Sequence, residues 1–361
     1  MLTRKIKETD VKYDCLVFIG RFQPFHIGHL EVVINALSKA KTVVILIGSS
    51  GQPRTFTNPW TFNERAEMIY EAVRAVNPSY TNRISCQPLR DIPENDQKWA
   101  SQVQSLVRDT LDMRSEGAMP VAPKTGIIGH SKDESSYYLK LFPQWGKPIE
   151  HALNEQVNAT DIRALILDGK NIKFVSGVLP PYVFEMVSDF QCTQEFSVLQ
   201  NEYATIKKYK KSWEVAPYKP VFVCTDACVI QSGHILLIKR AAAPGAGLMA
   251  LIGGFLEQDE YIQDGMIREL REETKLKVPT PVLIGSIKEV KVFDRPDRSA
   301  RGRTITHAFH IQLAAGPLPQ VKGNKEEGDP QWIPLSEVRE DQMFDDHFSI
   351  IQYFTGINSE Q

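Results

Sequence analysis

The sequence has few cysteines and no long apolar run. None of its apolar stretches approaches the about 20 residues that a membrane-spanning helix needs. Residues 1–14 are polar and lack the apolar core of a secretory signal. The five cysteines are scattered and odd in number, which argues against a disulfide framework. We therefore expect a cytoplasmic protein that does not bind membranes.

Neither sign of charge dominates. The 42 Lys and Arg residues nearly balance the 44 Asp and Glu residues, and the formal net charge is −2. This balance gives no global attraction to nucleic acid. The lysine cluster at 207–211 would suit nucleic acid, but a solvated helix end, where cations complement the helix dipole, is the favoured interpretation. The length of 361 residues indicates two domains.

One segment combines glycine and histidine at a predicted strand-to-helix turn. It reads Gly20-Arg21-Phe22-Gln23-Pro24-Phe25-His26-Ile27-Gly28-His29, after the apolar run 15–19 and before a helical pattern over 30–40. Backbone N–H groups and the helix dipole favour an anion at such a turn, and Gly28 permits close approach of a ligand. His26 and His29 can stabilise charge that builds up in phosphoryl or nucleotidyl transfer. Histidines that only cap the helix are the alternative.

Strand-like and helical patterns alternate from residue 12 to about 189. The strands are expected at 16–20, 43–48, 84–89 and 125–129, and the helices at 30–40, 63–76, 97–111 and 134–142. This alternation predicts a parallel sheet covered on both faces, with ligands at the carboxyl ends of its strands. No G-x-G-x-x-G follows the first strand, so a nicotinamide-dependent dehydrogenase is not supported.

A second candidate element is the segment 158–163. Thr160 can cap the helix that follows, and Arg163, one turn further, can contact phosphate with its planar guanidinium. Taken alone, an ordinary cap with a solvated arginine is the favoured interpretation.

The string GRFQPFHIGH resembles the HxGH signature of the nucleotidyltransferase superfamily, and in particular the nicotinamide mononucleotide (NMN) adenylyltransferases. The resemblance implies a Rossmann-like domain over 13–190 that transfers AMP from ATP to NMN, giving NAD and pyrophosphate. Segment 158–163 resembles the ISSTxxR motif, with Asn158-Ala159 in place of two serines. This implies that Thr160 and Arg163 bind the ATP phosphates, and that His26, His29, Arg163 and Mg²⁺ stabilise the transition state.

The same resemblance implies further nucleotide-binding residues. Segment 58–65 matches a loop-to-helix segment of the branch, and Trp99 matches a tryptophan that stacks on the pyridinium ring, as an indole face attracts a cation. A buried aromatic on an amphipathic helix is the alternative for Trp99. The full set implied for ATP and NMN is Gly20, Arg21, Phe22, Gln23, Gly28, Arg54, Trp99, Gly129 and Thr160, with Gly129 opening a loop over 129–133.

The composition changes after residue 190. A helical pattern over 194–211 and two prolines predict a connector over 191–219, followed by a second domain over 220–355. The apolar runs 221–229 and 234–239 flank Gln231-Ser232-Gly233, which is typical of a hairpin.

Three glutamates in the second domain have helical spacing. Glu269, Glu272 and Glu273 are at i, i+3 and i+4 and therefore share one helix face. Clustered carboxylates repel one another unless a divalent cation joins them, and hard oxygen ligands suit Mg²⁺ or Mn²⁺. A metal there can bind a diphosphate and activate a water molecule. A solvated helix face whose glutamates pair with neighbouring arginines is the alternative. It is disfavoured because Gly254 and Glu260 precede the three glutamates at the spacing of the motif described next.

These residues resemble the Nudix box, GX5EX7REUXEEXGU, with Lys275 in place of its second Gly. The resemblance implies an α/β/α sandwich, a brace between Glu260 and Arg268, and metal ligation by Glu269, Glu272, Glu273 and the backbone carbonyl of Gly254 or its neighbour Gly253. Glu269 and Glu273 are the implied catalytic residues. The missing Gly concerns only the left-handed end of the helix, so we expect activity to survive. Upstream, Met249 and Ile252 replace the Trp and Pro of many relatives.

Two features of the second domain leave alternatives open. A basic loop resembles the substrate loop of ADP-ribose-type Nudix proteins, which implies that Arg295, Arg298 and Arg303 hold the terminal ribose phosphate or the diphosphate; a flexible basic loop is the equal alternative. The general base is Glu326 or Glu327 outside the box, or Glu269 inside it.

The order of the two domains resembles the bifunctional NMN adenylyltransferase/Nudix hydrolase family. The resemblance implies that the second domain hydrolyses ADP-ribose to AMP and ribose 5-phosphate, so that ATP, NMN and ADP-ribose are the partners and nucleic acid is not. One rival hypothesis makes the Nudix domain a sensor that binds without turnover; another makes the first domain a different HxGH transferase. A homo-oligomer is compatible with the sequence, which does not define the oligomeric state.

Overall fold

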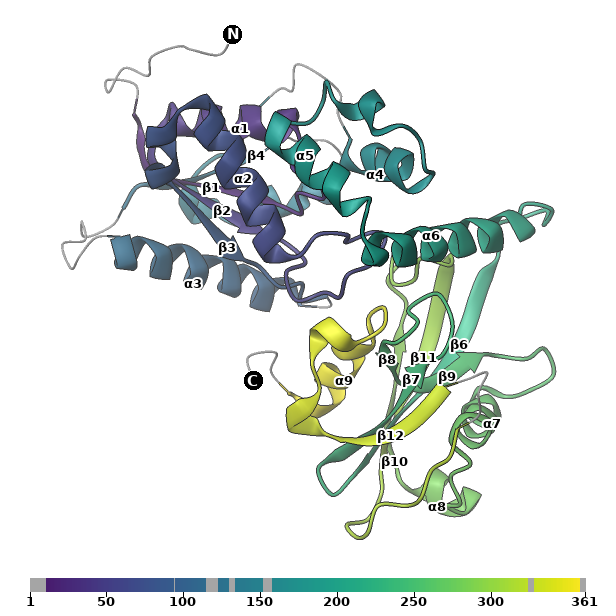
Figure 1. Cartoon of the computed structure of the whole chain (residues 1–361). Helices are drawn as coiled ribbons and strands as arrows, with labels where there is room; N and C mark the ends of the chain where they lie inside the picture. Colours follow the sequence, from purple (N-terminus) through teal and green to yellow (C-terminus); the bar gives the residue numbers. More distant parts are fainter. Residues whose placement is uncertain are drawn as a thin grey trace. The chain divides into compact units, whose positions relative to one another are not determined.

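The computed structural model describes residues 11–93, 95–114, 123–129, 134–151, 158–323 and 328–357 (Figure 1). The chain divides into two compact units, Met1–Gln200 and Asn201–Gln361. Within the described ranges, no helix has the length and apolar character needed to cross a bilayer.

The first unit is built on a five-stranded parallel sheet. Its strands are β1 (Tyr13–Gly20), β2 (Ala40–Ile47), β3 (Ile84–Pro88), β4 (Thr125–Gly129) and β5 (Ile149–Glu150), in the order β3-β2-β1-β4-β5. The strand order reverses direction at β1, so the carboxyl ends of β1 and β4 border the crevice where ligands bind in such sheets. The predicted parallel sheet is confirmed. The two-residue β5 was not predicted, because so short a strand leaves no alternation to read.

Helices cover both faces of this sheet (Figure 1). Figure 1 shows α1 (Ile27–Leu37) and α2 (Phe62–Val76) on one face and α3 (Asp96–Arg114) on the other. Side chains alternate along a strand, so Cys15, Val17 and Ile19 of β1 pack with the buried face of α3. Two further helices, α4 (Ala159–Leu167) and α5 (Pro181–Phe190), follow β5.

Two of the predicted helices of this unit differ from the structure in ways that matter for the site or the fold. The helix after β1 begins at Ile27 rather than at residue 30, so Gly28 and His29 lie in its first turn. The segment predicted as a helix over 134–142 is a 3-10 helix over Glu134–Lys140, and that prediction was wrong in type and length. A further helix, α6 (Gln194–Ser212), runs across the point where the two units divide.

The second unit contains a mixed seven-stranded sheet. Its strands are β6 (Val221–Gln231), β7 (His234–Arg240), β8 (Met249–Ala250), β9 (Ile252–Phe255), β10 (Ile287–Phe293), β11 (Arg303–Gln312) and β12 (Gly328–Pro334). Strand β6 pairs antiparallel with β7 through a two-residue turn at Ser232 and Gly233, whose φ angles are +48° and +75°. Two successive left-handed residues are what a hairpin turn requires, and the predicted hairpin is confirmed.

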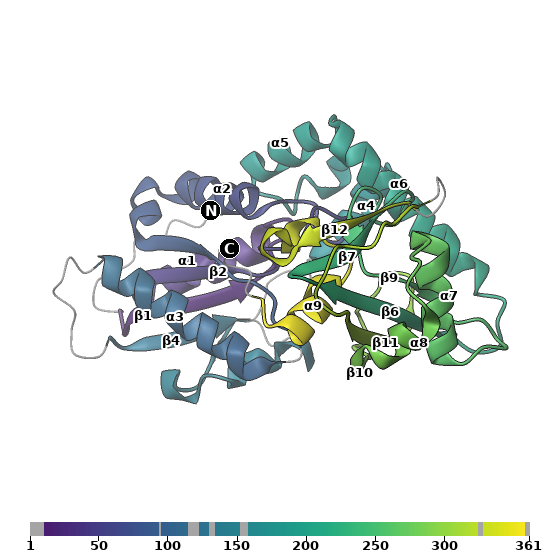
Figure 2. The same cartoon turned by 90° about the horizontal axis from the view of Figure 1, so that it is seen from below.

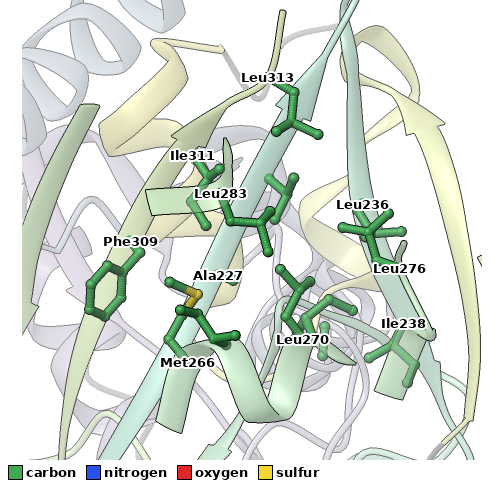
Figure 3. Packing of buried hydrophobic residues seen from close by; sticks show 14 of the residues in the cluster. Ala227, Leu236, Ile238, Met266, Leu270, Leu276, Leu283, Phe309, Ile311 and Leu313 are labelled. Atoms are coloured by element: carbon green, nitrogen blue, oxygen red, sulfur yellow. The ribbon is translucent and has the colours of Figure 1, made fainter. Parts of the chain in front are cut away.

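Helices pack on both faces of the second sheet (Figure 2). On one face lie α7 (Ile262–Thr274) and α8 (Thr280–Gly285); Met266 and Leu270 of α7 meet strand residues such as Ala227 and Phe309 (Figure 3). On the other face, α9 (His347–Thr355) buries Phe348 and Ile351. The predicted α/β/α sandwich is confirmed. Helix α7 ends at Thr274, and its C-cap residue Lys275 has φ of +51° and ψ of +26°, the left-handed conformation expected there.

Candidate functional sites

The two histidines of the first unit meet at the start of α1. His26 is the N-cap residue of the helix and is 4% exposed, and His29 lies one turn further. Their rings stack with centroids 3.6 Å apart, and the His26 backbone N–H donates to His29 Nδ1 at 3.3 Å. Gly28 is buried between them. The sequence element therefore forms a strand-to-helix turn at the carboxyl end of β1, where an anion would meet the helix N-terminus.

The loop before His26 is held by its own side chains. Phe22 adopts a left-handed φ of +52° and its buried ring packs edge-on against His29, with centroids 5.0 Å apart. A Cβ on Gly20 would lie 2.8 Å from that ring, so only glycine fits there. Gln23 is also buried; its amide donates to the Trp60 carbonyl at 2.8 Å and accepts from the Trp60 N–H at 3.0 Å. These contacts fix the shape of the turn.

Arg163 joins α4 to this loop. Its guanidinium donates to the Gln23 carbonyl at 2.6 Å and to the Thr160 hydroxyl at 3.1 Å. Both partners are neutral, and burial, together with the like charge of Arg21, lowers the pKa of Arg163 to about 10. The group therefore remains protonated at neutral pH and carries a charge that no carboxylate within the described ranges pairs with.

The expected cap of α4 is wrong in one detail. The N-cap residue is Asn158, whose side-chain oxygen accepts from the Thr160 N–H at 3.0 Å. Asparagine is among the strongest capping residues, so Thr160 lies inside the helix. Its hydroxyl is consequently available to accept from Arg163.

Sequence reasoning missed the part played by Arg65. This arginine of α2 is completely buried and donates to the Arg21 and Gly48 carbonyls, each at 2.7 Å, and to the Thr61 carbonyl at 3.1 Å. Burial lowers its pKa to about 10. The side chain ties together the carboxyl ends of β1 and β2. The only signal in the sequence is its place at the end of segment 58–65.

Three other predicted residues of this unit are less closely joined to the turn. Arg54 pairs with both carboxylate oxygens of Glu64 at 3.1 Å and lies over the Phe190 ring. Trp99, near the start of α3, packs against Tyr138 and Phe142, with ring centroids 6.2 Å away in each case. Gly129 ends β4, and residues 130–133 of its predicted loop lie outside the described residues.

In the second unit, Arg268 organises the acidic face of α7. It donates to both oxygens of Glu260, at 3.0 and 2.7 Å, and to Glu269 and Glu272 at 2.9 and 3.2 Å. These charge-assisted bonds keep the pKa of Glu260 below its ordinary value. Burial raises the pKa of Glu269 although Arg268 opposes the shift. The bidentate contact matches the brace that the box implied.

The carboxylates of α7 lie beside the glycine strand β9. Glu273 accepts from the Gly253 N–H at 3.2 Å, and a Cβ on Gly254 would stand 2.3 Å from Glu269 Oε1. The oxygen donors and the close glycine backbone suit a hard divalent cation. Within the described ranges, no three acidic, histidine or cysteine side chains converge as a ready ligand set. Metal ligation by Gly254, Glu269, Glu272 and Glu273 stays a prediction.

A pocket opens beside this glycine strand. Glu273 borders it from α7, and the other lining residues come from β6, β7, β9, the basic loop and the start of α9 with the turn before it. The lining residues are Cys224, Asp226, Ile238, Arg240, Leu251, Gly253, Gly254, Phe255, Glu273, Arg298, Arg301, Phe344, Asp345 and His347.

Only two of the four arginines of the basic loop, residues 295–303, line the pocket. Arg298 lines it and is held by two bonds to Asp346, at 2.9 and 2.8 Å. Arg301 also lines it and was not among the predicted site residues. Arg295 instead pairs with Asp297 at 2.7 Å, and Arg303 bonds to the Asp294 backbone carbonyl; neither is a lining residue. Their substrate contacts stay predictions.

The start of α9 and the turn before it were missed entirely. Phe344, Asp345 and His347 all line the pocket. His347 Nδ1 accepts from the Leu251 N–H at 2.9 Å, and burial lowers the pKa of this histidine to about 3, so the ring is neutral. No periodicity marks such a turn, so nothing in the sequence pointed to it. The proposed bases Glu326 and Glu327 lie outside the described residues.

Comparison with known proteins assigns both units. A cytidylyltransferase-like family model matches residues 17–108, and a NUDIX domain model matches residues 222–354. The chain thus joins a nucleotidyltransferase domain to a Nudix domain.

Relatives and solved structures define the family more closely. A nicotinamide/nicotinic acid mononucleotide adenylyltransferase from Acinetobacter baylyi is 38% identical over 53% of this chain and 94% of its own length. An ADP-ribose pyrophosphatase from Methanocaldococcus jannaschii is 34% identical over 34% of this chain and 64% of its own length. The crystal structure of a bifunctional NMN adenylyltransferase/ADP ribose pyrophosphatase from Francisella tularensis is 35% identical, covers 95% of this chain and 99% of its own, and has a TM-score of 0.86.

A second structure of the Francisella protein, with a TM-score of 0.84, is complexed with AMP and a manganese ion. At this identity and coverage, the chain belongs to the family of bifunctional NMN adenylyltransferase/ADP-ribose pyrophosphatases.

Proposed function

We propose that this protein is an enzyme with two active sites in NAD metabolism: it transfers AMP from ATP to NMN and hydrolyses ADP-ribose to AMP and ribose 5-phosphate. The observation that supports the proposal is that separate segments of the chain meet in each unit: Arg163 contacts the Gln23 carbonyl in the first, and Glu273 contacts the Gly253 N–H in the second. The catalytic domains we assign are 13–190 and 220–355, joined by the connector 191–219. A cytoplasmic location remains a prediction.

In the first unit, a phosphate oxygen of NMN attacks the α-phosphorus of ATP, and the bond to the β-phosphate breaks to release pyrophosphate. No residue serves as a covalent nucleophile. His26, His29 and Arg163 stabilise the charge that develops on the phosphoryl oxygens, and Thr160 contacts the outgoing phosphates. The indole of Trp99 stacks on the pyridinium ring of NMN and so orients this substrate. The fixed turn supplies the proximity on which such a transfer depends.

In the second unit, Glu269, Glu272, Glu273 and the Gly254 carbonyl would hold a divalent cation. When bound, such a cation neutralises the diphosphate and lowers the pKa of a water molecule. Arg268, fixed by Glu260, holds Glu269 and Glu272 in place. The oxygen of a water molecule attacks one phosphorus of the diphosphate, and a glutamate carboxylate takes up the proton that the water loses. The bond from that phosphorus to the bridging oxygen breaks, which separates AMP from ribose 5-phosphate.

Two assays test the proposal. The first mixes the protein with ATP and NMN and follows NAD and pyrophosphate; the second offers ADP-ribose, NADH, diadenosine polyphosphates and 8-oxo-dGTP with Mg²⁺ or Mn²⁺. We expect NAD formation in the first and turnover of ADP-ribose in the second. If ADP-ribose binds but no substrate of the panel is hydrolysed, the Nudix unit is a sensor and the hydrolase half of the proposal is wrong.

A further inference from the structure

The connector helix α6 presents one face to the second unit. Glu202, Ile206 and Tyr209 follow one another at i, i+4 and i+7 and therefore share this face. Glu202 is 8% exposed and Ile206 is 3% exposed, and the Tyr209 ring lies 5.8 Å from that of Phe222 in β6. All three residues precede the Nudix domain, residues 222–354. The helix thus adds a packed face, with a buried carboxylate, to the second unit.

This carboxylate holds a loop that has no polar side chain of its own. The loop between β7 and β8, residues 241–247, consists only of alanine, proline and glycine, and we call it the alanine loop. Side chains outside the loop must therefore fix its backbone. Arg240 donates to the Pro244 carbonyl at 2.9 Å, and Glu202 accepts from the Gly245 N–H at 2.9 Å. Because an ionised acceptor makes a stronger hydrogen bond than a neutral one, Glu202 ties the alanine loop firmly to α6.

The alanine loop in turn supports an aromatic ring of the Nudix pocket. Gly245 is buried with a φ of +76°, and a Cβ there would lie 2.2 Å from a carbon of the Phe344 ring. The loop backbone therefore packs directly on this ring. Phe344 is 4% exposed, lines the pocket, and donates its N–H to the Met249 carbonyl at 2.8 Å. A displacement of the alanine loop would leave one side of the ring without its support.

The end of α6 supports a second phenylalanine of the pocket. Trp213, just after the helix, lies with its ring 5.1 Å from that of Phe222. Phe222 lies 5.5 Å from Phe255, which lines the pocket. Two separate sets of contacts therefore connect α6 to the pocket lining, one through Gly245 and one through Phe222.

We propose that Glu202 is a positioning residue of the Nudix site: it holds the alanine loop against Phe344 and so fixes the pocket wall on which the substrate is bound. The proposal rests on the proposed hydrolysis of ADP-ribose and adds to it a residue of the connector helix. Glu202 does not line the pocket and acts only through the alanine loop. Helix α6 is then a structural part of the hydrolase site as well as a connector.

Steady-state hydrolysis of ADP-ribose by variants of the full chain tests this role. Glu202→Ala removes the acceptor, Glu202→Asp keeps the charge but is one methylene too short, and Glu202→Gln keeps an oxygen that can accept from the Gly245 N–H. Glu195→Ala is the matched control, since Glu195 is an exposed glutamate of the same helix in the first unit. Hydrogen exchange of residues 241–249 reports the loop itself, and thermal melting and NAD formation report folding.

We expect Glu202→Ala and Glu202→Asp to raise KM for ADP-ribose about fivefold, with kcat changed less than about twofold. The reason is that a loosened wall weakens binding of the substrate and of the transition state alike. Amides of residues 241–249 should exchange faster in these two variants, since their opening costs less free energy. Glu202→Gln and Glu195→Ala should match wild type in KM and in exchange, and NAD formation should be unchanged throughout.

A wild-type KM in folded Glu202→Ala and Glu202→Asp would overturn the proposal. An equal rise in Glu202→Gln would also overturn it, because the effect would then come from the charge and not from the hydrogen bond. Should Glu202→Ala fail to fold, the comparison of Glu202→Asp with Glu202→Gln decides. A wild-type protein that binds ADP-ribose without hydrolysing it would overturn the proposed function, and Kd from calorimetry would then replace KM in the same comparison.

Discussion

At the scale of single residues, the chemistry of this chain depends on contacts between distant positions. Arg163 reaches a carbonyl 140 positions earlier in the sequence, and Arg65 holds two strand ends through carbonyls. A guanidinium that donates to neutral oxygens keeps its charge available to a phosphate, which a carboxylate partner would cancel. Arg298 of the second unit is a contrasting case, because Asp346 neutralises its charge.

Asp345 gives a prediction with a defined pH dependence. Its φ is +45°, and burial raises its pKa to about 6, above the ordinary value of 3.8. The folded protein therefore holds this proton more tightly than the unfolded chain. The associated stability is present below pH 3.8 and is lost as the pH rises through 6.

Replacing Asp345 with Asn removes the charge and keeps a residue that tolerates a left-handed backbone. The free energy of unfolding of Asp345→Asn should exceed that of wild type by more at pH 7.5 than at pH 5, with a difference of about 1 kcal/mol. Urea unfolding of the Nudix unit at the two pH values measures it. An advantage that is equal at both pH values, or larger at pH 5, would show that Asp345 titrates normally.

At the scale of elements, local sequence patterns correctly predicted the helices, strands and turns that depend on neighbouring residues. The alternation of apolar runs predicted the parallel sheet, and the Ser232-Gly233 pair predicted the hairpin of β6 and β7. The carboxylate spacing placed Glu269, Glu272 and Glu273 on one face of α7. These features depend on residues close in sequence, whose periodicity is visible without the fold.

Features that depend on tertiary contacts were not visible in the sequence. The pocket draws on the turn before α9, because α9 packs on the sheet face opposite α7 and brings Phe344 and Asp345 beside β7 and the basic loop. Likewise, Asn158 rather than Thr160 caps α4, a choice between two capable residues that the helix start decides. The glycine-rich turn at His26 could be predicted, whereas its support by Arg65 could not.

Lys275, at the C-terminal end of α7, is where the sequence departs from the Nudix box, and substitutions there test the effect of that departure. Lys275 has a left-handed backbone conformation, which is about 1 kcal/mol less favourable for a residue with a side chain than for glycine. Lys275→Gly should therefore raise the free energy of unfolding of the Nudix unit by about 0.5–1 kcal/mol and leave ADP-ribose turnover unchanged. Lys275→Val should lower stability, since branching at Cβ aggravates the clash. Urea unfolding and the hydrolysis assay measure both effects; a destabilised glycine variant would contradict this account.

At the scale of the whole molecule, each unit has its own sheet, its own core and its own candidate site. The histidine turn and Arg163 lie in the first unit, and the acidic helix and the pocket beside it lie in the second. If the proposed function is right, one chain forms NAD and also returns AMP from ADP-ribose. Two sites built from separate residues predict two activities that can be removed one at a time.

The most direct test of this claim assays NAD formation and ADP-ribose hydrolysis on wild type, His29→Ala and Glu273→Gln. His29→Ala should lower NAD formation about 100-fold or more, as loss of a transition-state donor does, with hydrolysis unchanged. Glu273→Gln should remove hydrolysis with NAD formation unchanged. Parallel loss of both activities in either folded variant, or wild-type protein without ADP-ribose turnover, would contradict the account.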